Sequence, residues 1–343
     1  MKKLLYLFGL AAALSLAGCD LSGPQLRIGT IDRLEVCSDF IDDFDRDDAA
    51  LPAAPALREV TVSSGAAALR LLDRGLIDLA LVKYDTLLSA LMDKRKSEDN
   101  DVVYAALAGL FDLNCHVLVQ RNSGIEDLDD LFGKKLVMGR LGSGGGGTAV
   151  NLLKASGIEL PMVTVDEVDL ETGARLLQQG KIDALFINDQ VPSAAVAGLC
   201  RSTELRLLGL DEDVKQNLLR YEEGYRIRSV APGTYEGQEE AVELLSAQVV
   251  LMASQAVSRQ DAHRVLERLF ALGAARQHKD EQRPAHSEGT YLGKERPVLE
   301  SLSAGELNLS FHPGAADFYH EHGLEVKLFE QNVPLISIIA GQD

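Results

Sequence analysis

Apolar runs alternate with polar segments along most of this chain, and one stretch of that pattern occurs twice. Residues 70–82 (RLLDRGLIDLALV) are echoed by residues 175–187 (RLLQQGKIDALFI). In each copy, the spacing of apolar residues predicts a helix that ends at a glycine, Gly75 or Gly180, followed by an apolar run as long as a buried strand. The repeat therefore predicts two copies of one structural unit.

Two further apolar runs precede each copy of the repeat. Residues 60–62 and 163–165 are predicted strands directly before the repeated helices, and residues 26–31 and 136–138 are predicted to open each unit. Both units then have the order strand, helix, strand, helix, strand, which is typical of a doubly wound α/β lobe. The predicted fold class is α/β, with two such lobes.

Two apolar stretches are well placed to cross between the predicted lobes. Residues 104–120 separate the two copies of the repeat, and residues 248–253 lead back toward the first copy. We expect these stretches to form a two-strand hinge. The expected division is lobe one at residues 26–115 and 249–330, lobe two at residues 116–248, and a C-terminal tail at residues 331–343.

A glycine-rich segment, residues 142–147, lies between the strand that opens lobe two and a helix predicted from Thr148 to Ser156. Glycines let the backbone approach a ligand closely, and the N–H groups at a helix N-terminus favour negative charge. The segment therefore predicts an anion site, with a flexible linker as the alternative. The residues predicted to hold the anion are Ser143, Gly144, Gly145 and Thr148.

The same glycines allow two sharper interpretations. A phosphate-binding P-loop needs a lysine before its Ser or Thr, and this segment has none. The dinucleotide fingerprint is matched by Gly142, Gly144 and Gly147, with Asp166 after the next apolar run. Because so glycine-rich a segment matches almost any glycine pattern, a Rossmann-like enzyme stays an alternative only.

Ligands of α/β sheets collect at the carboxyl ends of the strands, where polar residues here follow the apolar runs. In lobe one these residues are Ser63, Ser64 and Gly65 after one strand, and Lys83, Tyr84 and Asp85 after the next. The alternative for each group is an ordinary strand-to-helix turn. The corresponding residues of lobe two are Asn188, Asp189 and Gln190.

Charge distinguishes the two halves of the predicted ligand site. After its opening strand, lobe one offers Asp32 and Glu35, which repel an anion, so lobe two is expected to hold most of it. A separate hypothesis is that Asp189 recognises an ammonium group and that the ligand is an amino acid. The predicted partners of the anion's charge are Arg33, Arg140 and Lys83.

The N-terminal residues have the pattern of a secretory signal. Lys2 and Lys3 precede an apolar run at residues 4–14, and small residues follow it. This run is too short for a stable membrane span. We therefore expect a signal peptide at residues 1–18.

The end of that signal, residues 16–19 (LAGC), resembles the bacterial lipobox. The resemblance implies that Cys19 is lipidated, becomes the first mature residue and starts a tether at residues 19–25. In Gram-negative bacteria it further implies that Asp20 favours retention at the inner membrane. We therefore expect a protein on the periplasmic side, held to the membrane by its lipid anchor.

Composition narrows the possible partners. Removing Lys2 and Lys3 takes the formal net charge from −18 to −20, which makes nucleic acid and anionic lipid surfaces poor partners. Besides Cys19 there are three cysteines, so at most one disulfide forms, and their spacing matches no metal motif. We expect neither a metal nor another cofactor. The three cysteines are Cys37, Cys115 and Cys200.

Several spaced motifs resemble those of one receptor family. Residues 126–137 (EDLDDLFGKKLV) are similar to the lobe-opening motif of bacterial solute-binding proteins. With four further motifs they occur in the order of the TAXI family, the extracytoplasmic receptors of certain tripartite ATP-independent periplasmic (TRAP) transporters. The further motifs are residues 142–148, 182–195 (IDALFINDQVPSAA), 231–238 (APGTYEGQ) and 311–315 (FHPGA).

The resemblance implies a type II periplasmic binding protein fold, with two α/β lobes around a cleft. It implies ligands such as glutamate or related carboxylates, and membrane-embedded TRAP subunits as partners. One departure concerns the loop after the first strand, where the family usually has a Gly-Gly-x-Tyr-Tyr-like sequence and this chain has residues 32–37 (DRLEVC). Half of the expected ligand cradle is therefore altered.

These observations predict a monomeric, lipid-anchored receptor that closes two lobes on a small carboxylate or acidic amino acid and does no covalent chemistry. A lipoprotein that signals to a membrane sensor or acts as a scaffold is the first alternative, because a sensor would use the same closure. A Rossmann-like enzyme is the second. No Ser-His-Asp order or cysteine nucleophile motif supports an enzyme.

Overall fold

The structure is a computed structural model of the whole chain, and it describes most of the two predicted lobes. Several predicted features lie outside the described residues: the signal peptide, Cys19, Arg33, Arg140, Ser143 and the C-terminal tail. The described residues are 25–31, 35–46, 49–96, 101–139, 144–221, 224–280 and 309–329.

The described strands form one 10-stranded sheet with the order β2-β1-β3-β10-β4-β7-β5-β6, to which β8 and β9 are added at β4 and β10. At one end, β1 pairs in parallel with both β2 and β3, as the predicted strand-helix-strand pattern requires. The elements of this half are β1 (Gln25–Ile31), α1 (Glu35–Asp45), β2 (Ala56–Val62), α2 (Gly65–Asp73), β3 (Leu79–Lys83) and α3 (Tyr84–Lys96).

The second half repeats this order. Here β5 pairs in parallel with β6 and β7, whereas β8 and β9 pair antiparallel with β4 and β10. Its elements are η1 (Asp129–Leu131), β5 (Lys135–Val137), α4 (Gly144–Ala155), η2 (Leu160–Met162), β6 (Thr164–Val165), α5 (Leu170–Gln178), β7 (Ala184–Asp189), α6 (Ala194–Ser202), β8 (Leu205–Leu208), α7 (Glu212–Tyr221) and β9 (Tyr225–Val230).

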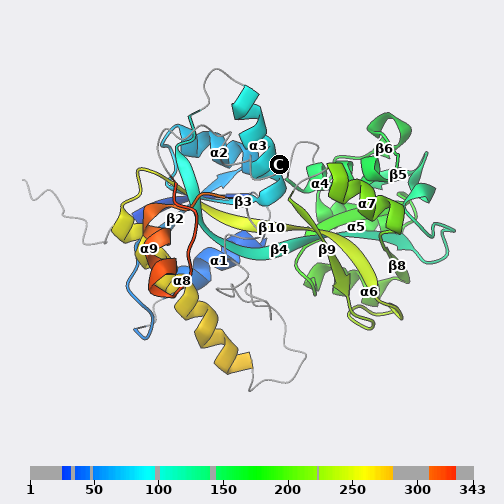
Figure 1. Cartoon of the computed structure of the whole chain (residues 1–343). Coiled ribbons are helices and arrows are strands. Elements are labelled where there is room, and N and C mark those ends of the chain that lie inside the picture. The colour runs from blue at the N-terminus through cyan, green and yellow to red at the C-terminus, as the bar shows by residue number, and fades with distance from the viewer. Residues whose placement is uncertain are drawn as a thin grey trace, which may run out of the picture.

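Two long antiparallel strands, β4 (Tyr104–Gln120) and β10 (Val242–Ser254), run through both halves (Figure 1). In one half β10 pairs with β3, and in the other β4 pairs with β7. The predicted α/β architecture of two doubly wound lobes joined by two strands is therefore confirmed. The second strand is longer than predicted, because residues 242–247 extend it by pairing with β9.

Hydrophobic cores occupy each half separately. One core contains Leu107 and Leu113 of β4 with Val249 of β10, whereas Cys115 and Ala247 already belong to a second core. In the second half, α4 and α7 cover one face of the sheet, and α5 and α6 cover the other. Each crossing strand thus passes from one hydrophobic core to the other. This passage supports the predicted lobe boundaries, which remain a proposal.

The repeated Ile-Asp pair has a structural explanation in both halves. The Asp78 carboxylate accepts a hydrogen bond of 2.8 Å from the backbone N–H of Arg27, and Asp183 accepts one of 2.8 Å from that of Lys135. Each aspartate thus ties the start of its strand to the opening strand of the same lobe. The glycines before them, Gly75 and Gly180, adopt φ angles of 63° and 64°, which favour glycine.

Replacing Asp78 by Asn should lower the free energy of unfolding at pH 7 by about 1–2 kcal/mol, because it weakens the bonds to the Arg27 N–H and guanidinium. The expected loss of stability is modest, because the Arg27 side chain is 40% exposed and water screens its charge. Urea unfolding measures the change. An Asp213→Asn variant, on the exposed side of α7, controls for the lost charge.

The same variant should also change the pH dependence. Hydrogen bonding to Arg27 lowers the pKa of Asp78 below its usual value. Its stabilising contribution is therefore present above the unfolded carboxyl pKa of about 4 and is lost as the pH falls through the folded value. The difference between wild type and Asp78→Asn should narrow as the pH is lowered from 7 toward 2. A constant difference would contradict this explanation.

The helix after the glycine-rich segment starts earlier than predicted. It begins at Gly144 rather than Thr148, so four glycines form its first turn. Glycine is a poor helix former, at about 1 kcal/mol per residue, and this argues for a later start. The first-turn N–H groups need no partner within the helix, however, and Ala149, Leu152 and Leu153 hold the helix against the sheet.

Two further helices, α8 (Arg259–Asp280) and α9 (Pro313–Glu321), pack against the first half. Ser258 caps the N-terminus of the first, because its hydroxyl accepts a hydrogen bond of 3.0 Å from the N–H of Asp261. Gly323, with a φ of 77°, follows the end of the second. A membrane-crossing helix is not found among the described residues.

Candidate functional site

A buried lysine connects the two halves of the molecule. Lys83 is the last residue of β3 in the first half, and only 3% of it is exposed. Its ammonium group donates a hydrogen bond to the hydroxyl of Thr148, on α4 in the second half, and lies 3.2 Å from a carboxylate oxygen of Asp85. Figure 1 shows α3 in the first half and α4 in the second, on the sides of the two halves that face each other.

A tyrosine adds a second connection. The phenol of Tyr225, at the start of β9, donates a hydrogen bond of 2.8 Å to Oδ2 of Asp85 and accepts one of 3.1 Å from the amide of Asn151 on α4. Burial, followed by the Asp85 charge, raises the pKa of Tyr225 well above its usual range. The phenol therefore stays protonated and serves as a donor.

The backbone approaches closely at the same junction. Gly224, with a φ of 93°, precedes Tyr225, and a Cβ there would lie 3.1 Å from the backbone N of Asp85 and 3.1 Å from a methyl of Leu88. The start of β9 in the second half thus packs directly on the first turn of α3 in the first half. Any side chain at position 224 would separate these two segments.

The chemistry of the junction favours negative charge. Hydrogen-bond donors come from the Lys83 ammonium group, the Asn151 amide and the Tyr225 phenol, while the N-terminal end of α4 adds its positive dipole. Asp85 supplies a carboxylate to this set. We call Lys83, Asp85, Thr148, Asn151 and Tyr225 the interlobe cluster.

A cysteine beside the interlobe cluster is not activated. Cys115 on β4 is a free thiol with 1% of its surface exposed. Burial raises its pKa to about 12, although the charge of Lys83 acts in the opposite direction. Because the thiolate is the nucleophilic form, this protonated thiol is a poor nucleophile.

The predicted residues of the first half have different environments. Ser64 is the N-cap of α2, and its hydroxyl accepts a hydrogen bond of 3.2 Å from Ala67 N–H. Ser63 is exposed, whereas Tyr84 is buried at the first position of α3, next to Lys83. Ser64 thus has the structural role given above as the alternative.

The predicted trio Asn188, Asp189 and Gln190 lies at the end of β7 and is divided between the two faces of the sheet. Asn188 is paired with Cys115, so it lies on the face of the interlobe cluster. Asp189 lies on the other face, where it accepts hydrogen bonds of 2.7 Å from the Ser193 hydroxyl and 2.8 Å from Gln190 N–H. Burial raises the pKa of Asp189.

A buried network that sequence reasoning missed supports the same end of β7. The Tyr235 hydroxyl lies 2.8 Å from Nε2 of His116 and accepts a hydrogen bond of 2.9 Å from the N–H of Ser193, the N-cap of α6. Burial lowers the pKa of His116 to about 4, so the imidazole is neutral at pH 7. Tyr235 and Ser193 lie within the motifs 231–238 and 182–195, so both motifs have a structural use here.

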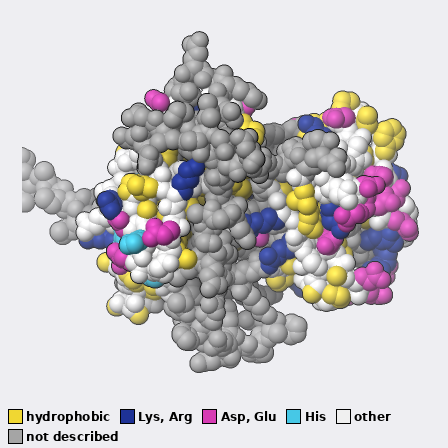
Figure 2. Space-filling view, in the orientation of Figure 1, with side chains coloured by type: hydrophobic (Ala, Val, Ile, Leu, Met, Phe, Trp, Pro, Cys, Tyr) yellow, Lys and Arg dark blue, Asp and Glu magenta, His cyan; other side chains and the backbone are white. Residues whose placement is uncertain are grey.

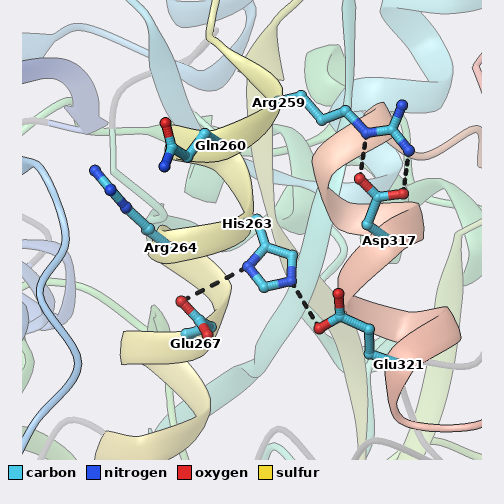
Figure 3. A pocket seen from close by; sticks show the side chains of 7 residues that line it. All are labelled: Arg259, Gln260, His263, Arg264, Glu267, Asp317 and Glu321. Carbon is cyan, nitrogen blue, oxygen red and sulfur yellow. Dashed lines mark hydrogen bonds and ion pairs between the residues drawn. The ribbon is translucent and has the colours of Figure 1, made fainter.

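A pocket of about 370 Å³ lies away from the interlobe cluster, between α8 and α9 (Figure 3). Two ion pairs join the helices here: His263 Nε2 lies 3.0 Å from Glu321, and Arg259 bonds to Asp317. Within the described ranges, no three His, Cys, Asp or Glu side chains are placed to hold a metal ion. The pocket is lined by Arg259, Gln260, His263, Arg264, Glu267, Asp317 and Glu321.

Surface charge is mixed on the face shown in Figure 2. On the second half, Lys and Arg side chains of the described residues lie beside Asp and Glu side chains rather than in one basic patch. Together with a net charge of −18, this face is a poor surface for nucleic acid.

Two solved structures of low sequence identity are similar to this one. PhnD1 from Prochlorococcus marinus, solved in complex with methylphosphonate, is 12% identical with a TM-score of 0.50, over 79% of this chain and 95% of that one. SsuA from Escherichia coli, a periplasmic aliphatic sulphonate binding protein, is 15% identical with a TM-score of 0.46, over 91% and 94%. The likeness to PhnD1 shows the predicted mixed α/β fold of type II periplasmic binding proteins.

A family model provides the evidence at the level of sequence. The model described as the NMT1-like family matches residues 54–323, which include both crossing strands and the whole interlobe cluster. The chain therefore belongs to the NMT1-like family.

Proposed function

We propose that this protein is a receptor that captures a small anionic solute between its two halves and does no covalent chemistry on it. One observation carries the proposal: Lys83 and Thr148 come from opposite halves and meet, buried, beside the N-terminus of α4. A buried ammonium group next to a helix N-terminus is an environment that favours an anion.

The proposed ligand is a small carboxylate such as glutamate, as the TAXI resemblance implies. Because PhnD1 has the same fold and was solved with methylphosphonate, phosphonates belong among the candidates. The interlobe cluster adds Asn151 and Tyr225 to the proposed contacts. The contacts proposed from the sequence are Ser143, Gly144, Gly145, Thr148, Ser63, Ser64, Lys83, Tyr84, Asn188, Asp189, Gln190 and Arg33.

The proposed setting is the periplasmic side of a membrane, with Cys19 as the lipid anchor and TRAP-type membrane subunits as the partner. Both parts rest on resemblances of sequence, the lipobox and the TAXI motifs. A membrane sensor in place of a transporter is the alternative, since lobe closure serves either partner equally.

Calorimetry tests the proposal. Glutamate, glutarate and methylphosphonate are titrated into the wild type and into Gly144→Val, which places a side chain in the first turn of α4. Hydrogen bonds to a charged group contribute about 1.5–3 kcal/mol each, so losing one should weaken binding about tenfold or more.

Gly198→Val is the matched control, because a Cβ at this position in α6 meets nothing within 4 Å. It should bind each anion as tightly as the wild type. If Gly144→Val also binds like the wild type, the first turn of α4 does not contact the anion. If the wild type binds none of the three anions, the proposed ligand class is wrong.

A further inference from the structure

Asp85 has the contacts that a bound anion would have. One of its oxygens, Oδ2, receives the hydrogen bond of 2.8 Å from the Tyr225 phenol and lies 3.2 Å from the Lys83 ammonium group. The donors come from both halves: Lys83 from the first, and Tyr225, steadied by Asn151, from the second. Asp85 therefore contacts donors from both halves, as the anionic group of a bound solute would.

We propose that Asp85 is an internal ligand that latches the two halves together when no solute is bound. Its carboxylate takes the place of the solute's anionic group, and the solute must displace it to bind. The latch itself stands independently of the proposed function, whereas the displacement rests on it.

Electrostatics explains why such a latch needs the carboxylate. Lys83 is buried beside the positive end of α4, and a buried cation is costly without a counter-charge. Asp85 supplies that charge, and Tyr225 and Thr148 then join the second half to the pair. Without the Asp85 charge, Lys83 and the dipole of α4 repel each other and the junction loosens.

Position explains how the latch can be released. Asp85 is the second residue of α3, so its carboxylate lies in the first turn of a helix, where negative charge is favourable. A displaced carboxylate therefore keeps one favourable interaction, that with the helix end, when it leaves Lys83. Asp85 and Thr86 also share a hydrogen bond of 3.4 Å in this turn.

The first experiment uses the full chain without ligand. Small-angle X-ray scattering and amide hydrogen exchange compare the wild type with Asp85→Asn and with Tyr225→Phe, which keeps the ring but lacks the phenol hydroxyl. We expect both variants to show a larger radius of gyration than the wild type and faster exchange at the start of β9. Tyr225→Phe keeps all charges, so it tests the latch even if Asp85→Asn folds poorly.

Asp73→Asn is the matched control. It removes the same charge from another aspartate–lysine pair, Asp73–Lys94 at 2.7 Å, which lies wholly within the first half. It should scatter and exchange like the wild type at β9. If Asp85→Asn and Tyr225→Phe also behave like the wild type, the halves are not latched by Asp85 and the inference is wrong.

The second experiment measures displacement, with glutamate and methylphosphonate as probes in calorimetry. Asp85→Asn should bind an anion roughly tenfold to a hundredfold more tightly, the usual size of coupling between two ligands. If anions bind wild type and variant equally, displacement is wrong while the proposed function stands. If neither probe binds but the variants open, the latch stands and the proposed function fails for these anions.

Discussion

Replacing Lys83 by Met should lower the free energy of unfolding by about 3–5 kcal/mol, because the variant leaves a buried carboxylate without its counter-charge. The Lys83 side chain is 3% exposed and that of Asp85 is 11% exposed, so water can compensate little of the loss. The hydrogen bond between Lys83 and Thr148 is lost as well. Urea unfolding at pH 7, followed by circular dichroism, measures the change.

Two further variants separate this cause from a general loss of packing. Lys83→Met combined with Asp85→Asn should recover much of the stability, since it removes the unpaired charge that makes the single variant costly. Lys94→Met breaks the more exposed pair with Asp73 and should cost only about 1 kcal/mol or less. A loss no larger for Lys83→Met than for Lys94→Met would show that the Lys83–Asp85 pair is not buried in solution.

The internal repeat predicted the fold well because its signals are local. Gly75 and Gly180 end their helices with positive φ angles, and Asp78 and Asp183 make the same hydrogen bond to the opening strand of their lobe. Each signal depends on residues within one repeated unit, so it could be recognised from the sequence of that unit. The crossing strand at residues 104–120 was equally clear, because its length exceeds that of an ordinary strand.

Helix starts were predicted less well where residue preferences oppose the tertiary structure. The run Gly144–Gly147 has low helix propensity, yet it forms the first turn of α4, since the packing of later residues fixes the direction of the helix.

The short strand β6, Thr164–Val165, lies where residues 163–165 predicted one, because its β-branched residues form the local signal.

The interlobe cluster was only partly accessible from the sequence. Lys83 and Thr148 are 65 residues apart and were both selected because they follow predicted strands. Asn151 is three residues after Thr148 on the same helix face, which is a signal that could have been used. Tyr225 is 140 residues from Asp85, and no pattern marks it, because its position depends on how β9 adds to β10.

The second large loss of stability is expected for a substitution in α9. Replacing Gly314 by Val should lower the free energy of unfolding by about 3 kcal/mol, at the upper end of what overpacking costs. A Cβ at Gly314 would lie 2.1 Å from the carbonyl oxygen of Arg259 and 2.9 Å from the Ala262 methyl. Because the first of these atoms is backbone, only a shift of α9 away from α8 could make room.

Such a shift should also separate the side chains that join these helices. Asp317 bonds to Arg259, and Glu321 bonds to His263, so both contacts would weaken together (Figure 3). Gly198→Ala is the control: this position inside α6 has open space, and alanine there should raise stability by about 0.5–1 kcal/mol. Urea unfolding of both variants gives opposite signs if close packing of α9 on α8 is the cause. If Gly314→Val is as stable as the wild type, α9 does not pack on α8 in solution, and the first half lacks part of its proposed core.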